Sequence, residues 1–195
     1  GVLLRAMEER RLLETLRGQL AVAEYDADGT LVALTGVQLP GVLDDLYADA
    51  ASGAGLGLTF DDEQPTFQLW APTAQSVTLL TWGEGDADPA RHEAVRDDTS
   101  GAWAVESPDG VAVGDEYLWE VRVYAHDTGK IETNLVTDPY AAALTTNSER
   151  SVVVDLADAS LQPELWREAE APEVERSVDR ANYELHIRDF SIADE

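Results

Sequence analysis

Residues 66–82 constrain the fold more than any other part of the sequence. Two short runs, 66–71 and 76–82, alternate apolar with polar residues, and a turn-like segment around Pro72 separates them. Alternation with a period of two, in runs rich in aromatic and β-branched residues, predicts half-buried strands. Because Pro72 has no backbone N–H, it should end the first strand or lie at a sheet edge. The residues expected to face the core are Phe67, Leu69, Val77 and Leu79.

Short strand-like runs continue beyond residue 82, and turn sequences such as Asp97-Asp98-Thr99-Ser100-Gly101 separate them. The run 76–82 also carries Leu80 and Trp82 on its second face, so both of its faces should be covered. About seven strands in about 95 residues match an immunoglobulin-like β-sandwich, and the predicted fold class is mainly β. The expected strands are 66–71, 76–82, 90–96, 102–107, 116–125, 130–136 and 151–156.

The chain before this region predicts a helix, a hairpin and a second helix. Residues 2–17 contain neither Gly nor Pro and carry an interrupted apolar stripe. The segment Asp26-Ala27-Asp28-Gly29 has the composition of a hairpin turn. Glycine-rich residues 52–57 predict a flexible joint, so we place a domain boundary near Leu58. The expected elements are helices over 2–17 and 42–51 and strands at 20–23 and 31–34.

The charge balance excludes some partners. The chain has 39 Asp and Glu against 13 Lys and Arg, a net charge of −26. Nucleic acid and anionic membrane surfaces would be repelled, so we expect neither as a partner. A neutral polysaccharide is compatible with this charge, although acidic surfaces mostly serve solubility.

The sequence predicts neither a metal site nor a cofactor. It has no Cys, and its three His are scattered without metal-ligand spacing. The first residues do not form a signal peptide, because charged residues follow at once, and the localisation stays unknown. No apolar run approaches the roughly 20 residues of a membrane-spanning helix. Both ends of the chain look cut from a longer protein.

Several motifs resemble a known family. The pattern Phe67-x-Leu69-Trp70-Ala71-Pro72-x-Ala74-x-x-Val77 resembles the first hairpin of the family 48 carbohydrate-binding module. Gly114-Asp115-x-Tyr117 is similar to the return strand of that module, and Asp138-Pro139-Tyr140-Ala141 with residues 152–156 is similar to its closing segment. This module precedes the catalytic barrel in debranching and branching enzymes of glycoside hydrolase family 13.

The resemblance extends to both sides of the module. Tyr183-Glu184-Leu185-His186-Ile187-Arg188-Asp189-Phe190-Ser191 is similar to the first barrel strand of pullulanase-type debranching enzymes. Residues 18–47 resemble the segment that joins earlier pullulanase domains to the module. The resemblance therefore implies a C-terminal orphan first strand of a (β/α)8 barrel. The implied parts are a linking segment (1–58), the module (59–156), a connector (157–182) and the start of the barrel (183–195).

The resemblance implies a parent enzyme that hydrolyses α-1,6-glucosidic branch links in α-glucans. A retaining mechanism needs two carboxylates about 5–5.5 Å apart. In the family these lie on later barrel strands, so no catalytic residue maps onto this chain, and we expect no activity from the chain alone. Its partner would be its own catalytic barrel, which the module would position. No cofactor is implied.

Sugar binding needs an exposed aromatic ring that stacks on a pyranose, with polar groups beside it. Trp82, at a strand end, and Trp103, after a turn, are the candidate platforms. For Trp103, which alternates with Val105, packing in the core is the favoured interpretation, and for Trp82 packing against a neighbouring domain is the alternative. The module also departs from glucan-binding members, which place a Lys after the Tyr of the return strand and a Trp in the next hairpin. Here Leu118 follows Tyr117, and the hairpin has no Trp.

His186, Arg188 and Asp189 are the other candidate site residues. A barrel strand delivers side chains to the active site at its C-terminal end. A structural ion pair or buried hydrogen bonds within the barrel are the alternative interpretation. Two further functions stay open for the whole chain: an autonomous α-glucan-binding module, and an unrelated immunoglobulin-like interaction domain.

Overall fold

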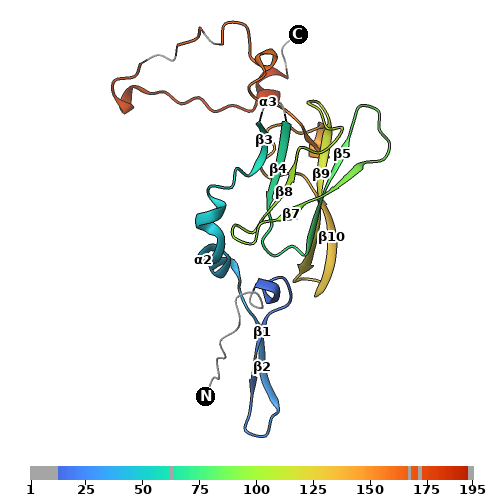
Figure 1. The fold of residues 1–195 in the computed structure, drawn as a ribbon. Helices are drawn as coiled ribbons and strands as arrows, with labels where there is room; N and C mark the ends of the chain where they lie inside the picture. The colour runs from blue at the N-terminus through green and yellow to red at the C-terminus, as the bar shows by residue number, and fades with distance from the viewer. Residues whose placement is uncertain (1–12, 62–63, 167, 171–172, 193–195) are drawn as a thin grey trace. The chain divides into compact units, whose positions relative to one another are not determined.

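The computed structural model describes residues 13–61, 64–166, 168–170 and 173–192. The chain forms two compact units, residues 1–155 and 156–195, and each is considered by itself. The first unit contains a β-sandwich and, before it, a hairpin and a helix (Figure 1). Among the described residues, no helix is both long and apolar enough to cross a membrane.

The sandwich consists of two antiparallel sheets, and the mainly β fold class is confirmed. One sheet has the order β10-β9-β5-β6, with β11 also paired to β9, and the other has the order β3-β4-β8-β7. The strands of the first sheet are β5 (Ser76–Trp82), β6 (Ala90–Glu93), β9 (Glu116–Ala125), β10 (Lys130–Val136) and β11 (Ser151–Val152). The strands of the second are β3 (Gly57–Asp61), β4 (Gln64–Trp70), β7 (Val95–Arg96) and β8 (Ala102–Glu106).

The core lies between the sheets and follows the predicted alternation. Phe67 of β4 meets Tyr117 of β9 edge to face, with ring centroids 5.0 Å apart. Such a pair contributes about 0.5–1.5 kcal/mol beyond the burial of its surface. Trp119 is completely buried beside them. The core cluster consists of Phe67, Leu69, Ala74, Val77, Leu79, Trp103, Val105, Tyr117, Trp119, Val121 and Val153.

A buried polar network closes the end of the sandwich. The Tyr117 hydroxyl donates to Asp138 Oδ2 at 3.1 Å, and the Asp138 N–H donates to the Ser151 hydroxyl at 2.9 Å. Burial raises the pKa of Tyr117 far above its ordinary value, so this phenol stays a neutral donor. Asp138 and Ser151 are themselves buried, which makes this closing segment an integral part of the core.

Two predicted strands differ from the structure. The run 90–96 is not one strand: β6 pairs with β5, whereas β7 pairs with β8 in the other sheet. The chain changes sheets at Ala94, whose N–H still donates to Val77 at 3.0 Å. The run 151–156 is a strand only over its first two residues, because the backbone of Val153 bonds to the loop at residues 114 and 115 instead of to a strand.

Strand β3 was not predicted, and it includes the boundary expected near Leu58. Gly57, the first residue of this strand, pairs with Gln68 of β4 and lies in close approach to Tyr140. A Cβ at Gly57, where φ is +93°, would lie 2.7 Å from Tyr140 Cβ, so only glycine fits there. The glycines that suggested a loose joint thus include one that the contact with Tyr140 requires.

The N-terminal elements agree with the prediction at the hairpin and differ at the helix. Strands β1 (Ala21–Tyr25) and β2 (Leu31–Gly36) form the expected hairpin, and Asp26 Oδ1 accepts hydrogen bonds from two backbone N–H groups of the turn. Helix α2 spans Pro40–Ala51 rather than 42–51, because Pro40 occupies its first turn, where no N–H is needed. The helix expected over 2–17 lies largely outside the described residues.

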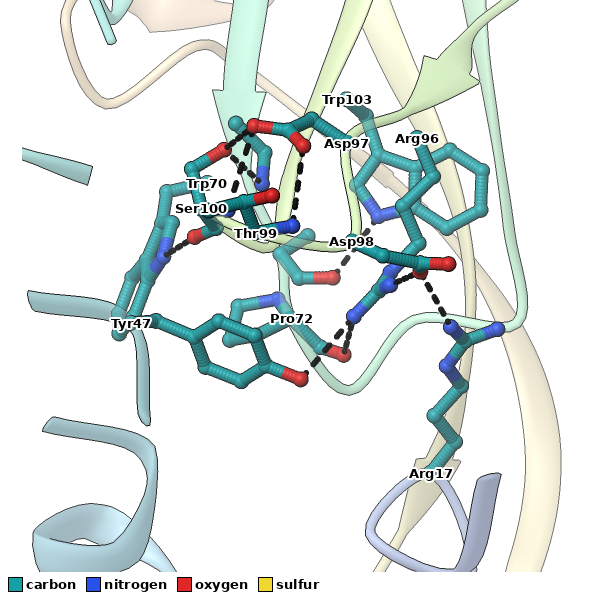
Figure 2. Close-up of polar contacts among 12 residues, drawn as sticks. Arg17, Tyr47, Trp70, Pro72, Arg96, Asp97, Asp98, Thr99, Ser100 and Trp103 are labelled. Carbon is teal, nitrogen blue, oxygen red and sulfur yellow. Dashed lines mark hydrogen bonds and ion pairs between the residues drawn. The ribbon is translucent and has the colours of Figure 1, made fainter. Parts of the chain in front are cut away.

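A polar cluster attaches these elements to the sandwich (Figure 2). The side chain of Arg96 in β7 is 7% exposed and forms an ion pair with Asp98. Its Nη2 donates to the Tyr47 hydroxyl of α2 at 3.2 Å and to the Pro72 carbonyl at 3.3 Å. Asp98 also binds Arg17 at 3.3 Å. Arg96 thus connects α2, the β4–β5 turn and the segment around Arg17.

The second unit contradicts the strand predicted over 183–191. Residues 183–186 have no regular structure, and Ile187–Ser191 form the short helix α3. A strand is stable only when its backbone groups bond to a neighbouring strand, and no strand of the described chain pairs with this segment. The segment therefore satisfies its backbone locally, for example through the Phe190 N–H donating to His186 at 2.9 Å.

We expect Arg96→Met to lower the free energy of unfolding by about 1–3 kcal/mol, because it leaves the Tyr47 hydroxyl and the Pro72 carbonyl without their charged donor. Arg91→Met is the matched control, since Arg91 pairs with Glu120 at 2.6 Å from a side chain that is 53% exposed. That exposed pair should contribute less than about 1 kcal/mol. Urea unfolding of both variants tests this, and equal losses would contradict the role given to Arg96.

Candidate functional site

Trp82 lies at the end of β5, on the face that points away from the core cluster. That second face is nevertheless covered, as expected from its apolar residues: Leu80 is 3% exposed and Trp82 is 8% exposed. Trp82 is therefore not a bare platform. Its surroundings decide what it can bind.

The cover over Trp82 is a cation from the same chain. The guanidinium carbon of Arg150 lies 4.0 Å from the centroid of the Trp82 ring. Arg150 Nη1 also donates to Glu116 Oε2 of β9 at 2.7 Å. Arg150 follows a short 3-10 turn, η1 (Thr146–Ser148), and directly precedes β11. The pairing of β11 with β9 brings Arg150 close to Glu116 and Trp82.

A polar hollow of about 420 Å³ opens beside this stack. Cavities of this size hold small ligands in many proteins. Asp86 Oδ2 accepts from the Gly83 N–H at 2.9 Å, and Asp115 Oδ2 accepts from the Ala112 N–H at 2.8 Å, so the lining loops are held in place. The lining residues are Trp82, Gly83, Glu84, Gly85, Asp86, Val113, Gly114, Asp115, Glu116 and Arg150.

The chemistry of the hollow suits a neutral polyol. Its carboxylates are acceptors for hydroxyl groups, Arg150 is a donor, and an indole ring lies alongside. Four acidic side chains, Glu84, Asp86, Asp115 and Glu116, surround the single cation and would repel an anionic ligand. Across the residues that the structure describes, no cluster of three or more His, Cys, Asp or Glu is arranged to hold a metal ion.

Trp103, the other candidate platform, is part of the core, as the core interpretation of its position expects. Its side chain is packed between the sheets, and its Nε1 donates to the Ala71 carbonyl at 2.9 Å. The turn before Trp103 suggested a surface position, but β8 pairs with β4 directly after that turn. Inward-facing residues of β8 are therefore buried from its first pair onward.

His186, Arg188 and Asp189 lie in the second unit, at the start of α3 and within it. All three are exposed, and His186 Nδ1 lies 3.5 Å from Asp189 Oδ2. Their role at a barrel remains a prediction.

Sequence reasoning missed the residues that surround Trp82. Arg150 and Glu116 carry no motif, and their meeting depends on β11 and β5 lying on opposite edges of β9. The one local signal was the run of Gly and acidic residues that follows Trp82, which predicts a turn and does not indicate a hollow.

Two family models match the chain. Residues 55–141 match carbohydrate-binding module 48, described as the isoamylase N-terminal domain, and residues 1–45 match the pullulanase N2 domain. The first covers most of the sandwich, including Trp82 but not Arg150. The second covers the hairpin and the start of α2.

Curated relatives resemble nearly the whole chain. A pullulanase of Klebsiella pneumoniae is 39% identical over 93% of this chain and 17% of its own length, and the chloroplastic pullulanase 1 of Arabidopsis thaliana is 36% identical over 93% and 19%. A solved structure of Klebsiella pneumoniae pullulanase complexed with maltotriose matches with a TM-score of 0.77 and 40% identity, over 83% of this chain and 15% of that one.

The chain therefore spans less than a fifth of the length of these curated relatives. The match to carbohydrate-binding module 48 spans the motifs found at Phe67–Val77 and around Tyr117, and both relatives cover 93% of the chain. The chain is thus a pullulanase-type N-terminal region that carries a carbohydrate-binding module of family 48.

Proposed function

We propose that this chain is the non-catalytic accessory region of a longer enzyme that hydrolyses α-1,6-glucosidic links in branched α-glucans. In this proposal the sandwich packs on the catalytic barrel and positions it, residues 183–195 begin the barrel, and residues 183–191 form its first strand. The catalytic carboxylates lie in the rest of the enzyme. The similarity to pullulanases, which spans nearly all of this chain, supports the proposal.

The observation that carries this proposal is the exposed apolar surface of the second unit. None of the described residues of this unit is buried, although many of them have large apolar side chains. Exposed apolar surface of this extent is typical of a segment that packs against a partner. The residues concerned are Leu156, Leu161, Leu165, Trp166, Val174, Val178, Tyr183, Leu185, Ile187, Phe190 and Ile192.

The partner that fits this surface best is the barrel of the same polypeptide. A barrel strand is buried between the central core and the surrounding helices, so apolar residues on both of its sides find cover there. Tyr183, Leu185 and Ile187 alternate with polar residues, as a strand requires, but none of the strands in the described part of the chain pairs with them. The short helix α3 is then the form that the segment takes without its barrel.

The chain alone should release no reducing sugar from pullulan or amylopectin, because a retaining glycosidase needs a pair of carboxylates about 5–5.5 Å apart that the proposal assigns to the rest of the enzyme. A reducing-end assay on a purified, amylase-free preparation measures this. Release of reducing sugar by this purified preparation would refute the accessory role.

Phe190→Ser tests the barrel assignment. In the full-length protein it should lower stability by about 3–5 kcal/mol, because the ring becomes buried in the barrel. In the 195-residue chain it should change stability by less than about 0.5 kcal/mol, because Phe190 is 62% exposed. Thermal unfolding of both proteins gives the comparison, with Val95→Ser as the control at an exposed position of the sandwich. An equal effect of Phe190→Ser in both proteins would contradict the assignment.

A second candidate function is direct binding of α-glucan at the hollow beside Trp82. It is favoured by the specific combination of an indole ring with carboxylate acceptors around a cavity of about 420 Å³. A pyranose presents an apolar C–H face and a rim of hydroxyls, which these groups complement. The relative solved with maltotriose is consistent with a short α-glucan as the ligand.

Trp82→Ala should weaken the retardation of the chain in native gels that contain glycogen or amylopectin, because the indole face is lost. We expect a loss of about tenfold in affinity, which corresponds to about 1.4 kcal/mol. Trp166→Ala is the control, since Trp166 is a 64% exposed tryptophan of the second unit. If only the control variant lost retardation, the glucan contact would lie at Trp166 and not at the hollow.

A further inference from the structure

The indole face that would stack on a sugar is already occupied in this structure. Arg150 lies over the Trp82 ring at 4.0 Å, and the ring is left 8% exposed. A guanidinium and a pyranose seek the same face of an indole, one for its negative quadrupole and the other for its apolar surface. Both cannot lie on that face at once.

Arg150 is held over the ring by both of its ends. Its side chain donates to Glu116 at 2.7 Å. At its backbone, the Arg150 N–H donates to the Thr145 hydroxyl at 2.9 Å, and the Thr145 N–H donates to the Arg150 carbonyl at 2.9 Å. The loop is therefore closed around the position from which Arg150 reaches Trp82.

The loop that presents Arg150 is also strained. Asn147 and Ser148 have φ values of +60° and +58°, a region that residues other than glycine rarely adopt, and here two such residues are consecutive. The isolated bridge between Leu144 and Ser151 closes the loop at its base. The surrounding hydrogen bonds keep this conformation, and it aims Arg150 at the ring.

We propose that Arg150 is a built-in cover that closes the Trp82 platform against the pyranose rings of a neutral α-glucan. Binding requires Arg150 to leave the ring, which breaks its stacking and shifts its pairing with Glu116. The guanidinium and the Glu116 carboxylate are then available to hydroxyl groups of the sugar, because both line the same hollow. This inference rests on the proposed glucan contact at Trp82, and it implies that the contact is weaker while Arg150 lies over the ring.

The Arg150–Glu116 pair differs from the Arg91–Glu120 pair on the same sheet in what its arginine covers. Arg91 donates to Glu120 at 2.6 Å and 3.3 Å. It is not among the arginines that stack on an aromatic ring in the described chain. Arg91 therefore provides a matched control: an exposed arginine on the same sheet, paired with a glutamate of the same strand β9, that covers no platform.

The first measurement needs no sugar. Acrylamide quenching of tryptophan fluorescence is compared between each chain and the same chain carrying Trp82→Phe, so that the difference reports Trp82 alone. Arg150→Ala should raise the quenching constant of Trp82 several-fold, and Glu116→Gln should raise it by a smaller factor, because Arg150 loses its anchor but remains. Arg91→Ala should leave it unchanged. An unchanged Trp82 constant in Arg150→Ala would overturn the proposal.

The second measurement uses glycogen in a native gel. Arg150→Ala should increase the affinity by about fivefold, in line with the strength of one cation–π contact, and Arg91→Ala should not. A fall in affinity would identify Arg150 as a direct sugar contact and overturn the cover, while leaving the glucan site itself intact. Absence of retardation in every variant, with Trp82 exposed, would overturn both. If Arg150→Ala fails to fold, as urea unfolding would reveal, Glu116→Gln supplies the same test.

Discussion

The rest of the first unit depends on the central position of β9. One edge of β9 pairs with β5, and the other pairs with β10 and β11, so β9 determines the register of the whole sheet. Its inward residues Tyr117 and Trp119 form the centre of the core. Its outward glutamates anchor the arginines of the surface, and Glu116 among them holds Arg150 over Trp82. The core and the candidate site are thus two faces of one strand.

Charge, in contrast, joins the N-terminal elements to the sandwich. Arg96 is nearly buried, and Asp98 is shared between Arg96 and Arg17. Burying a cation is costly unless it is paired and hydrogen-bonded, and Tyr47 and Pro72 supply those bonds. The result is a directional attachment, in which each element has to present its polar group at one place. An apolar contact would let the N-terminal elements slide over the sandwich, whereas the directional hydrogen bonds of Arg96 hold them in one position.

The two proposed roles, positioning a barrel and contacting glucan, make different demands on the surface. Positioning needs apolar area, and the second unit exposes it at residues such as Ile187 and Phe190. Sugar contact needs an accessible ring, and the sandwich buries or covers Trp82, Trp103 and Trp119. The exposed apolar area therefore supports the proposed accessory role, and the proposed glucan contact would require the displacement of Arg150. The unrelated interaction domain has no support, because pullulanases resemble nearly the whole chain.

The alternation of side chains along β4, β5 and β9 was sufficient by itself to predict these three strands, the sandwich and most of the core, because residues two positions apart on a strand lie on the same face of the sheet. The family motifs depend on the same local patterns. Tertiary structure alone decided where the chain changes sheets at Ala94 and that residues 183–191 are not a strand, because each outcome depends on which strand is present to pair. The position of Arg150 over Trp82 also depends on which strands pair. Arg150 reaches that ring only because β11 and β5 share β9, and no local pattern encodes a contact between residues so far apart in the sequence.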